Sequence, residues 1–145
     1  MSTTPARAPD APKTAFPSFQ VVFDGGALGN PGKGYGSYEI TSDGKVLCHR
    51  REEFGDNITN NQAEYMTLIH ALQWLADHLG ESRGTAKVLV NGDSKLVLFQ
   101  LLKKWKLKNE GLRPLYTEAS GLIREFFKVD LVWHPRAKSV ARLGH

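Results

Sequence analysis

The pattern of apolar and polar positions predicts three consecutive strands in the first part of the chain. An apolar run at 21–23 lies within a strand over about 18–24, and its unbroken character favours burial on both faces. Further strands are expected over about 34–41 and 46–54. The Asp43-Gly44 pair between them is typical of a tight hairpin turn. Because the connections are short, we expect an antiparallel meander.

Helices and strands are expected to alternate in the rest of the chain. Apolar residues at helical spacing predict a long helix over about 61–79, and a run of Val and Leu predicts a strand over 86–91. A short helix over 94–102, a long helix over about 112–126 and a strand over 129–133 follow. A strand, a helical crossover and a second buried strand imply parallel pairing. The order β-β-β-α-β-α-α-β therefore predicts an α/β fold, a mixed five-stranded sheet flanked by helices.

Length and composition limit the class of protein. With 145 residues, we expect one domain over 18–145, preceded by a flexible tail over 1–17 that is rich in Pro, Ala and Thr. Residues 139–145 could form a short helix or turn. The formal net charge of +4 is compatible with a polyanionic partner. The single cysteine, Cys48, excludes a disulfide framework and a cysteine-rich zinc site, and we expect it to be a small buried or edge residue.

No apolar run approaches the length that crosses a membrane, and no apolar secretion signal is visible near the start of the chain. We therefore expect a cytoplasmic protein that does not interact with membranes. We also expect it to be a monomer.

Three acidic residues occupy positions that the predicted sheet would bring together. Asp24 ends the first strand and is followed by Gly25 and Gly26, which permit close approach of another chain or an ion. Asp93 ends the strand that follows the long helix. Parallel neighbours place their carboxyl ends at one edge of a sheet, where open α/β sheets bind ligands. Glu64 lies in the first turn of the predicted long helix, and its side chain should point back toward the helix start.

Such a cluster indicates a metal site. Acids repel one another unless cations neutralise them, and oxygen ligands without cysteine or paired histidines suit Mg²⁺ or Mn²⁺. A two-metal carboxylate site performs in-line phosphoryl displacement. Each acid also has an ordinary structural explanation. Asp24 could end a strand in an ordinary Asp-Gly turn. Asp93 could cap the helix after it, and Glu64 could be a first-turn acid favoured by the helix dipole.

Four segments together resemble the type 1 ribonucleases H. They occur in the family's order over about Phe19 to Arg136, and they read FDGGALGNPGKGYG, ITNNQAEY, NGDSKLVLFQL and VWHPR. The resemblance implies a ribonuclease H-like fold and endonucleolytic cleavage of the RNA strand of RNA–DNA hybrids, with Mg²⁺ or Mn²⁺ as cofactor and two ions expected. It implies that Asp24, Glu64 and Asp93 are catalytic metal ligands.

The resemblance also suggests that Asn30, Asn60 and Asn61 read the RNA strand. A hybrid-specific nuclease must sense the 2′-hydroxyl, which both donates and accepts hydrogen bonds, and Asn offers both functions. Turn formation and helix capping are the structural alternative for these residues. Thr59 could contact a DNA phosphate, again by resemblance.

Trp105 lies among the lysines of 103–108, which resembles the family's surface for the DNA strand. Lysines bind phosphates, and an aromatic side chain can pack against a sugar or base. The alternative is a solvated basic loop in which Trp105 is buried in the core.

The chain departs from the family pattern after its last strand. The family normally has a fourth acid there, in an Ala-Asp pair, whereas residues 136–145 contain neither Asp nor Glu. His145, through its imidazole or through a terminal carboxylate, is the candidate fourth ligand, and Gly144 would allow the chain to turn inward. Many relatives carry a mobile histidine in a nearby loop. That loop is short here, and Arg136 or His134 occupies its vicinity.

Three functions therefore remain open at this point. The first is an active, metal-dependent ribonuclease H. The second is a catalytically weak hybrid-binding module, because the fourth acid is missing. The third is another nuclease on the same fold, such as an exonuclease or a resolvase. Asn30 and the Asn60-Asn61 pair favour the first, since a resolvase has no need to read a 2′-hydroxyl.

Overall fold

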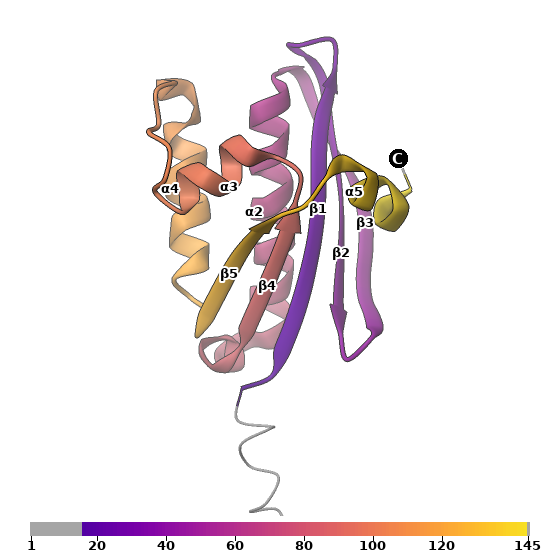
Figure 1. The fold of residues 1–145 in the computed structure, drawn as a ribbon, viewed down its shortest axis with the longest axis vertical. Helices are drawn as coiled ribbons and strands as arrows, with labels where there is room; N and C mark the ends of the chain where they lie inside the picture. Colours follow the sequence, from indigo (N-terminus) through magenta and orange to yellow (C-terminus); the bar gives the residue numbers. More distant parts are fainter. Residues whose placement is uncertain (1–15, 145) are drawn as a thin grey trace, which may run out of the picture.

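A five-stranded sheet lies at the centre of the computed structural model, which describes residues 16–144 (Figure 1). The strands are β1 (Ser18–Leu28), β2 (Gly32–Ser42), β3 (Lys45–Ile58), β4 (Lys87–Gly92) and β5 (Lys128–Trp133). Their order across the sheet is β3-β2-β1-β4-β5. The pairs β1–β2 and β2–β3 are antiparallel, and the pairs β1–β4 and β4–β5 are parallel. The predicted mixed sheet of an α/β fold is thus confirmed.

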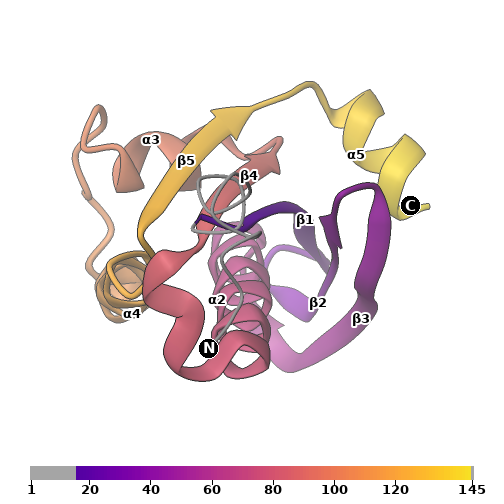
Figure 2. The same cartoon turned by 90° about the horizontal axis from the view of Figure 1, so that it is seen from below.

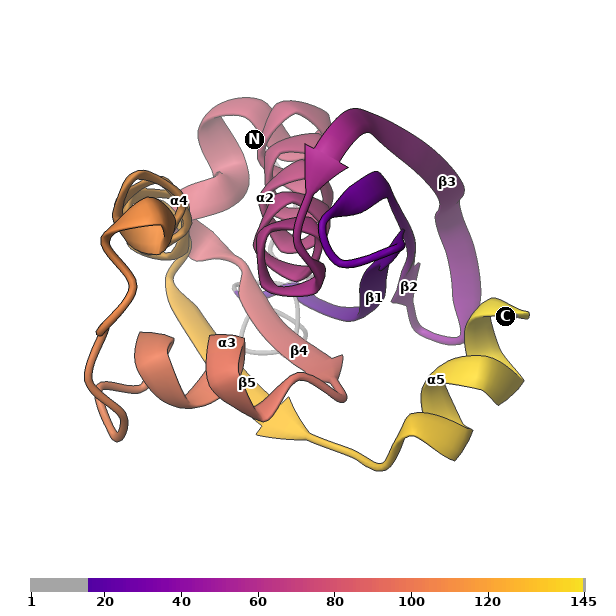
Figure 3. The same ribbon diagram turned by 90° about the horizontal axis from the view of Figure 1, so that it is seen from above.

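Helices cover the two faces of this sheet unequally. They are α2 (Asn60–Leu79), α3 (Lys95–Leu101), α4 (Arg113–Ile123) and α5 (Arg136–Leu143), with 3₁₀ turns η2 (Gly80–Thr85) and η3 (Glu110–Leu112). The long helices α2 and α4 lie side by side on one face (Figure 2). The short helix α5 lies on the other face, against β1 and β2 (Figure 3).

The core lies between the sheet and the helices α2 and α4. Val21 and Phe23 of β1 and Leu68 and Leu72 of α2 are all fully buried there. Burying one such side chain contributes about 1.5–3 kcal/mol, so this layer determines how α2 sits on β1. The apolar residues whose helical spacing predicted α2 are the ones that pack against the sheet. Cys48 is buried at the edge of the core, as expected.

Several element boundaries differ from the prediction. β1 continues to Leu28, because the glycines after Asp24 keep pairing with β2 instead of forming a turn. β3 continues to Ile58, through Gly55 and Asn57, which both have positive φ. The last helix, α5, spans Arg136–Leu143 and so begins three residues before the predicted 139.

Residues 1–15 of the predicted flexible tail lie outside the described residues. The two tail residues that the structure describes contact the sheet. The Phe16 ring lies 4.5 Å from that of Phe127, and the Pro17 carbonyl accepts a hydrogen bond from the Lys87 amide. Within 16–144, none of the helices combines the length and apolar character needed to cross a membrane.

Candidate functional site

Asp24 and Asp93 meet at one edge of the sheet because of the register between β1 and β4. Phe23 pairs with Gly92 in this parallel ladder, so the next residue on each strand is an acid. Only 1% of the Asp24 surface is exposed. A Cβ on Gly92 would lie 2.5 Å from the Phe23 ring, so glycine is required where the two strands come together before the acids.

Glu64 joins them from α2, and the contact depends on Gly25. A Cβ on Gly25 would lie 2.6 Å from the Ala63 carbonyl oxygen, so only glycine lets the helix approach β1 this closely. The Gly25 amide donates a 2.9 Å hydrogen bond to Glu64 Oε1. Because α2 begins at Asn60, Glu64 lies in its second turn. The expectation of a first-turn acid held by the helix dipole is therefore wrong.

The three carboxylates form one cluster. Asp24, Glu64 and Asp93 each offer an oxygen, and these atoms all lie within 4.8 Å of one another. Burial, followed by the charge of Asp93, raises the pKa of Asp24 from 3.8 to about 6. Burial and the charges of both aspartates hold the pKa of Glu64 well above its usual range. The protein thus holds carboxylates together where their negative charge is poorly tolerated, which is what a bound cation would relieve.

Among the ion pairs of the described residues, those of Arg136 reach the acids of the cluster. Its Nη1 lies 3.9 Å from Asp24 Oδ2 and 3.9 Å from Asp93 Oδ2. Its charge lowers the pKa of both Asp24 and Glu64, although less than burial raises them. Its side chain is 64% exposed, so the guanidinium can turn toward solvent.

His134, the other residue expected near this place, is engaged elsewhere. Its Nε2 lies 2.7 Å from the Ser139 hydroxyl in α5, and its backbone amide donates to the Gly92 carbonyl. Burial lowers the pKa of its imidazole. Asp93 does not cap α3, because Ser94 does so by accepting a hydrogen bond from the Val97 amide. The capping alternative for Asp93 is therefore wrong.

Asn30 and Asn60 join the β1–β2 turn to the start of α2. Asn30 Oδ1 accepts a 3.0 Å hydrogen bond from the Asn60 amide, and Asn60 Oδ1 accepts a 2.9 Å bond from the Ala27 amide. Thr59 caps α2 in a reciprocal capping box with Gln62. These residues thus have the turn and cap roles that the sequence left open. The two hydrogen bonds of Asn30 and Asn60 use their Oδ1 atoms and not their Nδ2 groups.

Asn61 and Trp105 line the same pocket beside α2. The pocket has a volume of about 480 Å³, and Lys104, Lys106 and Lys108 also line it. Trp105 is 46% exposed and its ring lies edge-on to Phe99, with ring centroids 5.1 Å apart. Trp105 is therefore a surface residue, and the alternative that placed it in the core is wrong.

The predicted fourth ligand, His145, lies outside the described residues. Within 16–144, the carboxylate cluster has three members. Arg136 was noted from the sequence only for its position, and no residue pattern assigned it to the acids. An arginine at the start of a helix has no distinctive spacing, and its approach to two carboxylates appears only once α5 is placed.

Comparisons with known proteins place this arrangement in a family. Residues 23–141 match the family described as reverse transcriptase-like. The bifunctional protein Rv2228c of Mycobacterium tuberculosis is 40% identical over 118 residues, which is 80% of this chain and 31% of that protein. The chain therefore spans about a third of the length of this relative. Ribonuclease HI of Halobacterium salinarum is 35% identical over 79% of this chain and 55% of its own length.

Solved structures agree with this relationship. The structure of LC11-RNase H1 in complex with an RNA/DNA hybrid has a TM-score of 0.79 and 31% sequence identity, and the match covers 87% of this chain and 91% of that chain.

Proposed function

Because the chain belongs to the reverse transcriptase-like family, and within it to the type 1 ribonucleases H, we propose that it cleaves the RNA strand of RNA–DNA hybrids by hydrolysis. The family depends on divalent metal ions. One observation carries the proposal for this chain, namely the meeting of Asp24, Glu64 and Asp93 within 4.8 Å at a buried edge of the sheet. A carboxylate cluster of this kind has little structural value without a cation.

We propose that the carboxylate cluster binds two Mg²⁺ or Mn²⁺ ions. All three donors are hard carboxylate oxygens, which suit these ions. Divalent ions bound there would polarise a phosphoryl oxygen and lower the pKa of an attacking water. Asp24, within β1, and Asp93, directly after β4, would hold the ions, and the Gly25 amide would keep Glu64 oriented toward them. His145 stays our proposal for a fourth ligand. The described residues do not support it, because α5 runs from Arg136 beside the acids to Arg142 at β2, away from the cluster.

Arg136 would contact the phosphate that reacts. Its guanidinium already lies between two of the acids, and it can bind a phosphate oxygen with charge-assisted hydrogen bonds. In that position it would stabilise negative charge that develops on the phosphate during hydrolysis.

The substrate would lie across the start of α2. Asn30 and Asn60 are exposed, and Asn60 lies one helical turn before Glu64. Their Nδ2 groups could donate to 2′-hydroxyls of the RNA strand while their oxygens maintain the turn. Asn61 would extend this contact toward Trp105 and its neighbouring lysines, which would bind the DNA strand. Thr59 would contact a DNA phosphate next to them.

A direct test compares labelled RNA–DNA hybrid, RNA duplex and DNA duplex with Mg²⁺ and with Mn²⁺. We expect cleavage inside the RNA strand of the hybrid alone, and loss of cleavage in Asp93→Asn. Equal cleavage of the DNA duplex would refute hybrid specificity. Tight hybrid binding without cleavage would favour a hybrid-binding module. The lack of Asp and Glu in residues 136–144 is the observation that favours a hybrid-binding module.

A further inference from the structure

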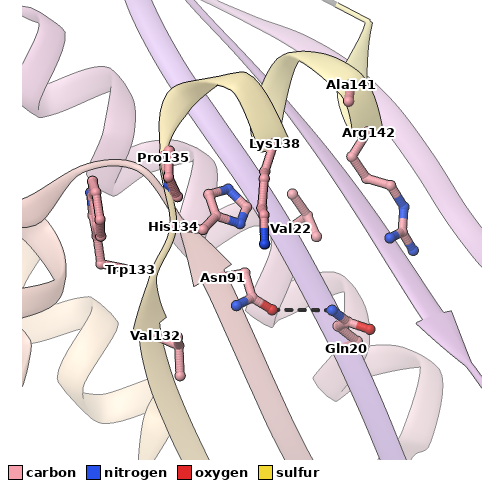
Figure 4. A pocket seen from close by; sticks show the side chains of 10 residues that line it. All are labelled: Gln20, Val22, Asn91, Val132, Trp133, His134, Pro135, Lys138, Ala141 and Arg142. Carbon is pink, nitrogen blue, oxygen red and sulfur yellow. Dashed lines mark hydrogen bonds between the residues drawn. The ribbon is translucent and has the colours of Figure 1, made fainter.

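Helix α5 lies over a hollow in the protein surface. This cavity of about 500 Å³ lies between one side of the helix and residues of β1, β4 and β5 (Figure 4). Lys138, Ala141 and Arg142 border it from the helix, while Gln20 and Asn91, which are hydrogen-bonded to each other, border it from the sheet. Packing therefore fills only part of the space beneath α5, where Ser139 and Leu143 are buried, and an eight-residue helix is not stable on its own. Its position must depend on a few specific contacts.

One end of α5 is fixed by the chain itself. The helix follows β5 after two residues, and the His134–Ser139 contact joins its first turns to that connection. These contacts determine where α5 begins, but they leave the direction in which it runs open.

The other end is fixed by an ion pair across the sheet. Arg142 Nε donates to Glu39 Oε1 in β2, and His49 Nδ1 lies 3.2 Å from the second oxygen of the same carboxylate. The Glu39 side chain is only 9% exposed. Loss of Arg142 would leave this carboxylate with His49 as the partner that remains, which is costly, so the pair holds the end of α5 on β2. Leu143 is buried next to it.

Arg136 stands at the opposite end of the same short helix. Arg142 follows it by six positions, a rise of about 9 Å along the helix. The 3.9 Å distances from its guanidinium to Asp24 and Asp93 are too long for direct hydrogen bonds, so these contacts do not hold the helix in place.

We propose that the Glu39–Arg142 ion pair positions Arg136 at the acids by fixing the direction of α5. Glu39 and Arg142 are then positioning residues for hydrolysis, although neither contacts the carboxylate cluster. This inference rests on the proposed function for its effect on turnover, and its effect on metal binding can be measured without any cleavage.

The first test measures Mn²⁺ affinity by calorimetry, in the absence of nucleic acid. Arg136→Ala removes a cation from beside the acids, so we expect Mn²⁺ to bind at least about threefold more tightly. Glu39→Gln and Arg142→Gln release α5, and each should raise the affinity by a similar factor. A general loss of structure would weaken binding, so the expected sign separates positioning from damage. Unchanged or weaker Mn²⁺ binding in both variants would overturn the proposal.

The second test asks whether the ion pair acts through Arg136. In an Arg136→Ala background, Glu39→Gln should change neither the Mn²⁺ affinity nor kcat by more than about twofold, because coupled residues are not additive. In the parent background it should lower kcat with little change in KM. The reversed pair Glu39→Arg with Arg142→Glu should recover part of both effects. Additive losses in the double variant would show that Glu39 is merely structural.

Glu125→Gln provides a matched control. It breaks the exposed Arg83–Glu125 pair, whose atoms lie 3.1 Å apart near η2 and the end of α4. Both Mn²⁺ affinity and kcat should stay within about twofold of the parent. If the parent fails to cleave hybrids at all, the proposed activity fails, while the Mn²⁺ measurements still decide the role of the ion pair.

Discussion

Asp24→Asn should stabilise the protein when no metal is present. The pKa of Asp24 rises from 3.8 to about 6 in the folded protein, chiefly because the carboxyl is buried and next because Asp93 is negative. The folded state therefore binds the Asp24 proton more tightly than the unfolded state does. Ionisation of Asp24 then destabilises the fold, and stability is lost as the pH rises from about 4 to about 6.

The size of this effect follows from the pKa. At about 1.4 kcal/mol for each pKa unit, the rise to about 6 corresponds to about 3 kcal/mol at pH 8. Asparagine resembles the protonated carboxyl in size and charge, so it should recover much of this energy. The attraction between Asp24 and Arg136 is lost in the variant, which makes about 3 kcal/mol an upper limit.

Urea unfolding in EDTA at pH 4, 5, 6 and 8 provides the assay. The difference between variant and parent should be largest at pH 8 and close to zero at pH 4. Saturating Mn²⁺ should reverse the order, because an ion that binds only the folded parent stabilises it. Asp130→Asn, an exposed acid on β5, is the control and should change stability by less than about 0.5 kcal/mol. A variant that is less stable at pH 8, or a difference independent of pH, would refute this reasoning.

Four further predictions concern activity and binding. Asp93→Asn should lower the rate of hybrid cleavage at least about a hundredfold while circular dichroism stays unchanged, and normal turnover would rule out its role as a metal ligand. Asn61→Ala should reduce the preference for hybrid over DNA duplex by about 1 kcal/mol in competition binding, and an unaltered preference would argue against 2′-hydroxyl reading. Trp105→Ala should weaken hybrid binding by about 1–3 kcal/mol, measured by fluorescence anisotropy, whereas a change below twofold would remove it from the interface. Lys106→Ala should reduce the slope of log affinity against log salt by about 0.7–0.9, and an identical slope would show that this lysine contacts no phosphate.

The parts of the fold that local patterns specify were predictable from the sequence. The apolar stripe of α2 follows from periodicity, and the meeting of Asp24 with Asp93 follows from the geometry of parallel strands. The end of β1 did not follow, because Gly25 and Gly26 look like a turn until β2 is seen to pair with them. Local sequence cannot distinguish a glycine that bends the chain from one that admits a neighbouring helix.

The contacts around α5 could not be predicted from the sequence for a different reason. Glu39 and Arg142 are 103 residues apart, and neither belongs to a periodic pattern or a motif. Their pairing depends on how α5 crosses the sheet, which is a tertiary property. Arg136 depends on the same placement, so its approach to the acids could not be derived before the helix was located.

The hydrogen bonds between β1 and α2 match the residue spacing of a strand to that of a helix. Gly25 and Ala27 are two residues apart on a strand, a distance of about 6.6 Å, and their amides bind Glu64 and Asn60, which are four residues apart on a helix, a rise of about 6 Å. Because the two distances are nearly equal, the same stretch of β1 backbone holds Glu64 of the carboxylate cluster and Asn60, the proposed RNA contact. An insertion of a single residue between Asn60 and Glu64 would rotate one of them by about 100° around the helix axis. The loops around these two hydrogen bonds can therefore lengthen during evolution, whereas a change in the spacing between Asn60 and Glu64 would separate the proposed RNA contact from the proposed metal site.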